Sequence, residues 1–275
     1  MSTPSPTPNA VSSPAPVAAA SGPSAVVIED DEAVRDILLE VFESAGFTAI
    51  GAENGMDGVE AVRRHNPRIT TIDINMPGID GFETVKRVRA ISETYIVLVT
   101  ARADESDAVL GLSVGADDYV TKPFRLREFR ARVEAMLRRP RRVDSSSSDA
   151  ITPPTIETAT TAPSNVLAHR DLRLDMLART VHRDGVEVAL TRTEFDLMQT
   201  LLESNRRARS KEDLALVVRG DEPGASYVSD LDKRAIEAHV ANLRRKLGDS
   251  SDSPRYIETV RGVGYRLTAT LTTAR

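Results

Sequence analysis

Short apolar runs alternate with helical patterns through the first half of the chain. Between the apolar runs, residues such as Val34, Leu38 and Val41 recur at the spacing of one helix face. Five runs predict strands: Ala25–Ile28, Phe47–Ile50, Ile69–Ile72, Tyr95–Val99 and Tyr119–Thr121. Because these strands are apolar on both faces, the pattern predicts a doubly wound α/β domain, a parallel sheet covered by helices on both sides.

The second half of the chain has a different pattern. Short strands are predicted at Leu172–Leu174 and Val186–Ala189, followed by helices and a closing hairpin from Tyr256 to Leu267. Thr191 and Glu194 have the spacing of a capping box, which predicts the start of a helix. This half is therefore predicted to be an α+β domain with a helical core.

Two stretches lack the large apolar residues that a core requires. Residues 1–23 are dominated by Ser, Pro, Ala and Thr and contain no Lys or Arg, which predicts a disordered tail rather than a secretory signal. Residues 139–163 predict a flexible linker that need not hold the domains in a fixed pose. The expected domains are then residues 24–138 and 164–275.

The composition excludes several kinds of site and several classes of protein. The chain has no cysteine, which excludes disulfides and thiolate metal sites, and its 4 histidines are scattered. Its apolar runs are too short to span a bilayer, so we expect a cytoplasmic protein without membrane contact. Charge differs between the halves: residues 24–138 hold 14 basic and 21 acidic residues, and residues 164–275 hold 19 and 17. The two domains should therefore have different partners.

Polar residues follow the predicted strands of the first half. Glu29 and Asp30 follow the first strand, Asp73 ends the third, and Thr100 and Lys122 end the fourth and fifth. In a doubly wound sheet these ends meet at one edge, where ligands bind. Crowded carboxylates repel by about 4 kcal/mol per pair at ~4 Å and an effective dielectric near 20. A hard divalent cation, Mg²⁺, would relieve this repulsion, and Lys122 and Thr100 would contact a phosphoryl group.

A simpler interpretation treats the acidic run as a complement to a helix N-terminus and Lys122 as an ordinary surface lysine. The coincidence of all these positions at strand ends favours phosphoryl chemistry.

The runs VVIEDDEAVR, IDINMPGIDGFE, VTAR and GADDYVTKPF resemble the flavodoxin/CheY-like receiver domain of two-component response regulators. The resemblance implies that Asp73 accepts a phosphoryl group from a sensor histidine kinase. It implies Mg²⁺ ligation by Glu29, Asp30, Asp73 and the backbone carbonyl of Asn75.

Further roles follow from the same resemblance. Lys122 and Thr100 would contact the phosphoryl group, Tyr119 would be the aromatic switch, and Lys122-Pro123 would be a cis peptide bond. A carboxylate nucleophile that forms an acyl phosphate agrees with the chemistry of the residues. Such a protein catalyses its own phosphorylation and slow dephosphorylation but is not an enzyme with an external substrate.

Residues 232–247 predict an amphipathic helix with a basic side. Its apolar stripe holds Ile236, Val240, Leu243 and Leu247, and the opposite face presents Arg234, Ala238, Ala241, Asn242 and Arg245. Arg244 and Lys246 flank that face and suit phosphate contacts. The alternative is that this helix is an ordinary solvated helix whose charged face binds nothing. The hairpin that follows also carries Arg255, Arg261 and Arg266, which favours a basic binding surface.

The runs LTRTEFDLMQTLL, LRRKLG and TVRGVGYRL resemble the winged-helix output domain of OmpR/PhoB-type regulators. The resemblance implies that the helix enters the major groove of promoter DNA and that the wing contacts the minor groove or backbone. The candidate DNA contacts are Arg234, Ala241, Asn242, Arg244, Arg245, Lys246, Thr259, Arg261 and Tyr265.

Three positions depart from the family pattern. Ala241 and Asn242 replace two arginines of the recognition helix, which favours adenine or thymine over guanine contacts. Arg219 stands where tryptophan is usual, so the surface that family members offer to RNA polymerase is altered at this position. In the helix after the fourth strand, Leu110 and Ser113 stand where the family usually has a basic and an acidic residue that form ion pairs across the dimer. The remaining candidates for a homodimer interface are Asp117, Glu128 and Arg132, together with Leu110 as an apolar contact.

We expect a phosphorylation-dependent DNA-binding transcriptional regulator. A regulator of the same fold that acts without phosphorylation is the main alternative. An aspartate-based phosphatase is disfavoured because Asn75 takes the place of its acid–base Asp, and a flavodoxin-like electron carrier because the chain has no Trp.

Overall fold

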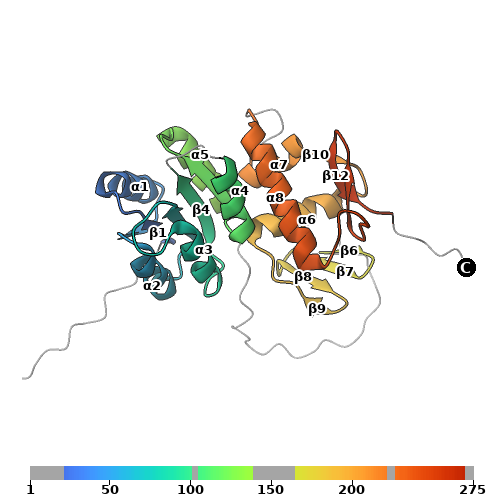
Figure 1. The fold of residues 1–275 in the computed structure, drawn as a ribbon. Helices are drawn as coiled ribbons and strands as arrows, with labels where there is room; N and C mark the ends of the chain where they lie inside the picture. The colour runs from blue at the N-terminus through green and yellow to red at the C-terminus, as the bar shows by residue number, and fades with distance from the viewer. Residues whose placement is uncertain (1–21, 101–104, 139–164, 222–226, 270–275) are drawn as a thin grey trace, which may run out of the picture.

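The computed structural model describes residues 22–100, 105–138, 165–221 and 227–269 of the chain (Figure 1). In these ranges the chain forms two domains that lie against each other. The predicted linker and nearly all of the predicted tail lie outside the described residues.

The first domain is a five-stranded parallel sheet with strand order β2-β1-β3-β4-β5, as the pattern predicts. Its elements are β1 (Ser24–Ile28), α1 (Glu32–Ser44), β2 (Thr48–Ala52), α2 (Gly55–His65), β3 (Ile69–Asp73), α3 (Gly81–Arg89), β4 (Tyr95–Thr100), α4 (Glu105–Val114), β5 (Asp118–Thr121) and α5 (Leu126–Arg138). All five predicted strands are confirmed within one or two residues.

Alternate residues of each strand enter two separate cores. On β1, Ala25 and Val27 pack with α1 and α5, whereas Val26 and Ile28 pack with α2, α3 and α4. Gly58 lets α2 approach closely, since a Cβ there would lie 2.2 Å from the Ile28 Cδ1 atom. This two-sided burial fixes the sheet so that the carboxyl ends of β1, β3, β4 and β5 share one edge.

The second domain packs helices between two antiparallel sheets of order β6-β7-β8-β9 and β10-β12-β11. Its elements are β6 (Val166–His169), β7 (Leu172–Asp175), β8 (Thr180–Arg183), β9 (Val186–Glu187), α6 (Arg192–Glu203), β10 (Arg209–Ser210), α7 (Lys211–Arg219), α8 (Asp230–Leu247), β11 (Ile257–Val260) and β12 (Gly264–Leu267). The α+β class and the closing hairpin are confirmed, while β6, β8 and β10 were not predicted.

Capping boxes define where the two main helices of this domain begin. The predicted box of Thr191 and Glu194 starts α6. A second box, formed by Ser229 and Asp232, starts α8. The predicted stripe of Ile236, Val240, Leu243 and Leu247 is buried in the domain core.

The domains meet where α4 lies beside α8 (Figure 1). Helix α4 is apolar on both sides: Ala108 and Leu112 are buried in the core of the first domain, which continues into Ala235 and Ala238 of α8. We call this the docked arrangement. Small apolar side chains on both helices allow this close packing, so the two domains contact each other directly.

Among the residues described, no helix combines the length and the apolar character required to cross a bilayer.

Candidate functional site

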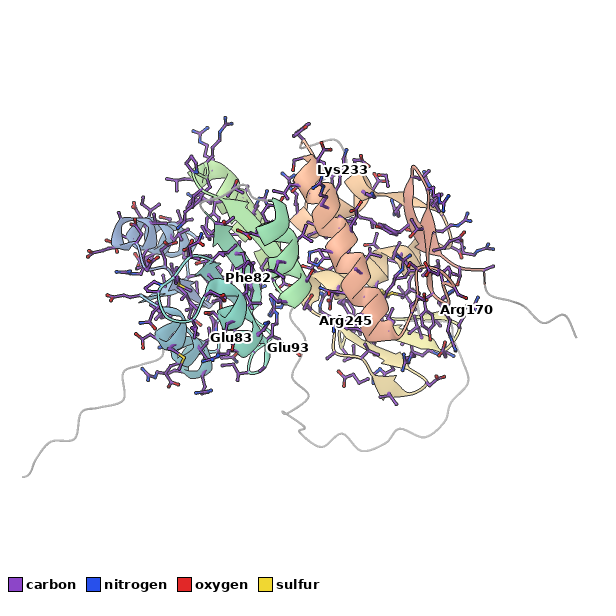
Figure 2. All side chains as sticks on the ribbon, viewed as in Figure 1. Phe82, Glu83, Glu93, Arg170, Lys233 and Arg245 are labelled. Atoms are coloured by element: carbon purple, nitrogen blue, oxygen red, sulfur yellow. The ribbon has the colours of Figure 1, made fainter. Side chains whose placement is uncertain are left out.

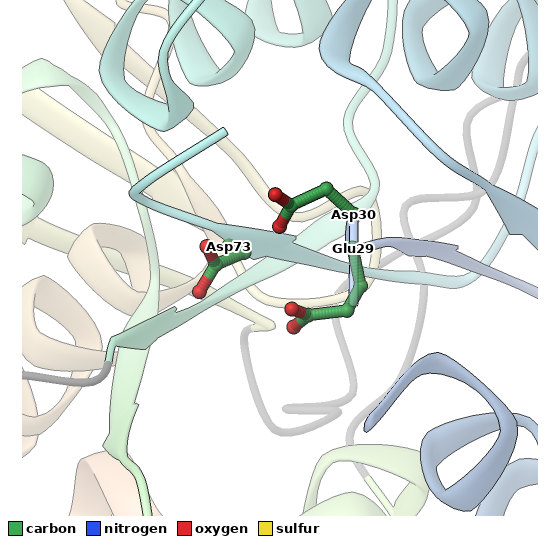
Figure 3. Close-up of side chains that lie close together, drawn as sticks. All are labelled: Glu29, Asp30 and Asp73. Carbon is green, nitrogen blue, oxygen red and sulfur yellow. The ribbon is translucent and has the colours of Figure 1, made fainter. Parts of the chain in front are cut away.

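Three carboxylates gather at the carboxyl edge of the sheet. Glu29 and Asp30 follow β1, Asp73 ends β3, and these strands are paired in register, with Ile28 opposite Ile72. The three groups each offer an oxygen within 4.8 Å of the others (Figure 3). Glu29 and Asp73 are buried and Asp30 is exposed. The acidic residues predicted from the sequence thus form one cluster that is open to solvent on one side.

Lys122 reaches the same cluster from the end of β5. Its Nζ atom lies 2.7 Å from Glu29 Oε1 and 3.0 Å from Asp73 Oδ1. Burial opposes the ammonium charge, but the hydrogen bonds to Glu29 and Asp73 outweigh it and raise the Lys122 pKa. Lys122 is therefore charged throughout the physiological range and lies within reach of a group on Asp73.

The cluster fits a hard cation. Burial raises the pKa of Glu29, and repulsion from Asp73 and Asp30 adds to it. Glu29 Oε2 is buried without a hydrogen-bond partner. A divalent ion held by oxygen ligands would satisfy that atom and offset the repulsion. The backbone amide of Asn75 donates to Asp73 Oδ2 at 3.0 Å, so this residue lies beside the phosphoacceptor candidate, and ligation by its carbonyl stays a prediction.

The remaining predicted receiver residues lie at the same edge of the sheet or on β5. Thr100 ends β4 and is buried, and its carbonyl accepts a hydrogen bond from the Lys122 amide at 2.6 Å. The peptide bond between Lys122 and Pro123 is cis, as the resemblance implies. Tyr119 lies on β5 and is also buried.

Tyr119 contacts the second domain. Its side chain belongs to the same apolar cluster as Ala235 and Ala238 of α8, and it lines a cavity together with Ser229, the N-cap of α8. Burial raises the Tyr119 pKa, and the negative charges of Asp232 and Asp118 raise it further. The predicted switch residue thus lies beside the start of the predicted recognition helix.

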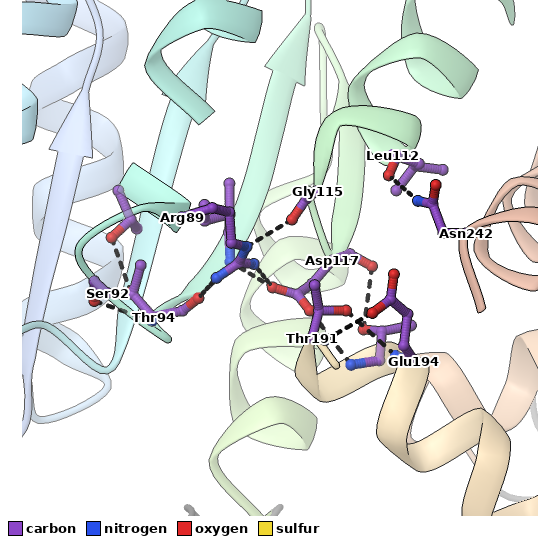
Figure 4. A network of polar contacts seen from close by, with 12 residues as sticks. Arg89, Ser92, Thr94, Leu112, Gly115, Asp117, Thr191, Glu194 and Asn242 are labelled. Carbon is purple, nitrogen blue, oxygen red and sulfur yellow. Dashed lines mark hydrogen bonds and ion pairs between the residues drawn. The ribbon is translucent and has the colours of Figure 1, made fainter. Parts of the chain in front are cut away.

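One side of that helix is covered by the first domain. Ala235, Ala238 and Asn242 of α8 are buried at the contact with α4. Asn242 Nδ2 donates to the Leu112 carbonyl in the last turn of α4, at 2.9 Å (Figure 4). Asn242 was predicted to contact DNA, and in the docked arrangement its amide has a protein partner instead.

The other predicted DNA contacts fall into two groups. Arg234, Ala241, Arg245 and Arg261 are exposed. By contrast, Lys246 pairs with Glu194 at 2.6 Å, and Arg244 donates to Thr259 Oγ1 at 2.8 Å. Thr259 is exposed on the wing.

Tyr265 does not fit its predicted place on the wing. It is only 5% exposed and belongs to the core of the second domain. The alternation along β12 explains this, because Tyr265 and Leu267 point inward while Arg266 points outward. The structure gives no support for a DNA contact of the Tyr265 ring.

Asp117 is the centre of a second contact between the domains. Its carboxylate pairs with Arg89, accepts from the Ile96 amide at 2.9 Å and accepts from the Thr193 amide of α6 at 3.3 Å (Figure 4). Burial opposes ionisation, but Arg89 and the backbone amides outweigh it and lower the Asp117 pKa. Asp117, predicted at a dimer interface, is therefore fully buried inside the chain.

The other candidates for a dimer interface differ in exposure. Arg132 pairs with Asp118 of its own domain at 3.0 Å, whereas Leu110 on α4 is 48% exposed. The side chain of Glu128 lies outside the described residues. Because Asp117 and Arg132 have partners within the chain, the structure does not bring the predicted dimer residues together as a free surface.

The contact between the domains is not continuous. A cavity of about 330 Å³ lies between them, with Glu93 on the side of the first domain and Arg245 and Lys246 on the α8 side. Glu93 and Arg245 stand on either side of the boundary in Figure 2. Interfaces between domains that are partly polar and incompletely packed separate readily.

Comparisons with known proteins agree with this arrangement. Residues 25–134 match the response regulator receiver domain, and residues 185–267 match the C-terminal domain of transcriptional regulatory proteins. The chain is 37% identical over 245 residues to the transcriptional regulatory protein AfsQ1 of Streptomyces coelicolor, covering 89% of this chain and 98% of AfsQ1.

It is also 34% identical over 241 residues to the DNA-binding response regulator MtrA of Mycobacterium tuberculosis H37Rv, covering 88% of this chain and 95% of MtrA. The solved structure of a RitR mutant has the same fold, with a TM-score of 0.65 at 21% identity over 90% of this chain and all of that chain. The chain therefore belongs to the two-component response regulators of the OmpR/PhoB type.

Proposed function

We propose that this response regulator accepts a phosphoryl group on Asp73 from a sensor histidine kinase and thereby controls its own binding to promoter DNA. Asp73 is the nucleophile: a bond forms between its carboxylate oxygen and phosphorus as the phosphorus–nitrogen bond to the kinase histidine breaks. Support comes from the position of Asp73, buried at a strand end beside Glu29 and Lys122.

Glu29, Asp30, Asp73 and the Asn75 carbonyl would hold Mg²⁺. When bound, the ion offsets the charge of the carboxylates and of the phosphoryl oxygens. Lys122 neutralises a phosphoryl oxygen from the other side, because its ammonium already lies 3.0 Å from Asp73 Oδ1. Thr100 supplies a hydroxyl donor from the end of β4.

DNA binding belongs to the second domain. We propose that α8 enters the major groove and that the exposed Arg234, Arg245 and Arg261 contact DNA, with Arg261 on the wing. Arg244 and Thr259, which are bonded to each other, would contact the backbone. MtrA, which shares both domains, is described as a DNA-binding response regulator.

The observation that carries the regulatory part of the proposal is the covered face of α8. Packed helices lie roughly 8–10 Å apart, and the major groove, ~12 Å wide, admits one helix. With α4 against Ala235, Ala238 and Asn242, a duplex cannot enclose α8. The docked arrangement is therefore a form that does not bind its site, and DNA binding requires the domains to separate.

Phosphorylation would bias this equilibrium through Tyr119. If Thr100 moves toward the phosphoryl group and Tyr119 turns inward, the contact of Tyr119 with the start of α8 is lost. Separation then frees the face formed by α4, β5 and α5, including Asp117, for a second copy of the chain. Docking and dimerisation use the same surface, so they exclude each other.

The acyl phosphate is lost slowly by hydrolysis, and the chain turns over no external substrate. The protein acts in the cytoplasm, where promoter DNA lies. A contact with RNA polymerase stays a prediction of the family resemblance, because Arg219 pairs with Asp221 and Asp232 in its own domain.

A labelling experiment tests the proposal. A small phosphodonor with Mg²⁺ should add one phosphoryl group that is stable in acid and labile to hydroxylamine, and Asp73→Ala should abolish it. The same treatment should increase DNA binding in the wild type and not in Asp73→Ala. Unchanged labelling of Asp73→Ala would refute the site. Labelling without any change in DNA binding or dimerisation would favour the regulator that acts without phosphorylation.

A further inference from the structure

Arg35 reaches from α1 to the loop that carries the acidic residues. Helix α1 begins after Asp31, whose side chain accepts from the Val34 amide, so Arg35 lies in its first turn. Its Nη1 atom donates to the Glu29 carbonyl at 2.8 Å and lies 3.4 Å from the Asp30 carbonyl. The side chain is only 11% exposed. One guanidinium thus holds the backbone of both loop residues that belong to the carboxylate cluster.

The aliphatic part of Arg35 is held by β2. Gly51 lies opposite Val27 of β1, and a Cβ at this position would be 3.3 Å from both Arg35 Cδ and Leu39 Cδ1. The missing side chain at Gly51 therefore leaves the room through which Arg35 passes. Arg35 Nη2 also lies 3.7 Å from Glu53 Oε1, but Glu53 is 78% exposed and adds little.

The loop needs such a restraint because its side chains repel. Glu29, Asp30 and Asp73 each place a carboxylate oxygen within 4.8 Å of the others, and Asp30 is exposed. Charge-assisted hydrogen bonds to the two carbonyls fix the peptide planes and hence the directions in which the Cα–Cβ bonds of Glu29 and Asp30 leave the chain.

We propose that Arg35 is a positioning residue for the phosphorylation chemistry. By holding the carbonyls of Glu29 and Asp30, it keeps their carboxylates directed toward Asp73 and so sets the affinity of the site for Mg²⁺. This inference rests on the proposed function, since it assigns a role toward the same cluster. Groups that orient metal ligands change metal affinity by about 10- to 100-fold when removed.

The test is a calorimetric titration of the full chain with Mg²⁺ in the absence of phosphodonor. Arg35→Ala should raise the Kd for Mg²⁺ by about tenfold or more. Arg35→Lys should restore part of the affinity, because an ammonium on a shorter stem reaches one carbonyl. Glu53→Ala is the matched control: it removes the exposed ion-pair partner of Arg35 and should bind Mg²⁺ as the wild type does.

Two further measurements separate positioning from a general role in folding. The melting temperature of Arg35→Ala in EDTA should remain close to that of the wild type. Its phosphorylation rate should fall at low Mg²⁺ and return to the wild-type rate at saturating Mg²⁺. A large fall in melting temperature in EDTA, or a rate that saturating Mg²⁺ does not restore, would overturn the proposal and make Arg35 structural.

Asp30→Ala distinguishes failure of this inference from failure of the proposed function. If Asp30→Ala weakens Mg²⁺ binding and Arg35→Ala does not, the positioning role is wrong and the site stands. If Asp30→Ala binds Mg²⁺ with wild-type affinity, the proposed site is wrong, and the role of Arg35 fails with it.

Discussion

The carboxylate of Asp117 accepts a hydrogen bond from the backbone amide of Thr193, 76 residues further along the chain. Thr193 lies in the first turn of α6, so the receiver supplies a negative charge at the positive end of a helix in the output domain. The Thr193 hydroxyl also donates to the Asp117 carbonyl, at 3.3 Å. These contacts make the docked arrangement specific in orientation, which apolar contact between α4 and α8 alone would not do.

Asn242→Ala should increase DNA binding by the unphosphorylated protein. The substitution removes the hydrogen bond to the Leu112 carbonyl, which is worth about 0.5–1.5 kcal/mol and thus shifts docking by roughly 2- to 13-fold. Fluorescence anisotropy with promoter DNA measures the change. The control is the same substitution in residues 164–275 alone, where no receiver covers α8 and affinity should not rise. An equal increase in both would show that docking is not the cause.

Asp117→Asn should destabilise the protein and weaken docking together. Asp117 is fully buried, and the change leaves Arg89 without its counter-charge, at a cost of about 3–5 kcal/mol. Urea denaturation measures the free energy of unfolding. Arg130→Ala, which breaks the exposed pair with Glu134, is the comparison and should cost less than ~1 kcal/mol. Similar losses in the free energy of unfolding for the two variants would contradict a stabilising role of the contacts around Asp117.

Acid should open the docked arrangement through His239. This residue is buried in α8, its Nε2 has no hydrogen-bond partner, and it faces Glu194, Asp117 and Asp118. Lys246 and Arg89 already pair with Glu194 and Asp117. Burial lowers the His239 pKa below 6.5 despite these carboxylates. If separation exposes His239 to water, the separated protein binds a proton near pH 6.5 that the docked protein does not, so docking should weaken as pH falls.

Small-angle X-ray scattering between about pH 7.5 and 5.5, on either side of the ordinary histidine pKa, tests this expectation. The wild type should expand toward the acidic end of this range, and His239→Gln should expand less. Because the Asp117 pKa is lowered, Asp117 makes docking depend on pH only below its ordinary pKa of 3.8, and so it does not contribute to the pH dependence between about pH 7.5 and 5.5. If His239→Gln expands at low pH as much as the wild type does, the expansion is caused by the titration of another group.

Binding of DNA by residues 164–275 should depend steeply on salt. Each phosphate contact contributes about −0.9 to the slope of log affinity against log salt concentration. Arg245 and Arg261 are exposed, so Arg245→Ala and Arg261→Ala should each reduce the slope by about one contact. Glu203→Ala, at the exposed end of α6, is the control and should leave the slope unchanged. A slope near zero in the unsubstituted domain would argue against groove docking.

The fold and the carboxylate cluster follow from local patterns. Apolar runs buried on both faces specify a parallel sheet, and such a sheet places Asp73 beside Glu29 whatever else the chain does. Capping at Thr191 is likewise a matter of residues three positions apart. These features need no information about distant partners.

The docked arrangement could not be predicted in the same way. Ala235 and Ala238 are small enough for a groove of DNA or for another helix, and their pattern does not distinguish the two. Asp117 and Arg132 were predicted at a dimer interface, but Asp117 bonds to Arg89 and Thr193, and Arg132 pairs with Asp118 of its own domain. Tyr265 was predicted on the wing surface, although β-strand alternation places it inside.

If α8 contacts either α4 or DNA, as proposed, a single substitution there alters two equilibria at once: docking and DNA binding. Genetic selection for variants that respond without a stimulus should therefore return changes at Ala235 or Ala238, far from the phosphorylation site, as well as changes in the receiver. In the proposed mechanism, the helix that contacts DNA is also the helix that docking covers, so an altered binding specificity would be inherited together with an altered threshold for activation.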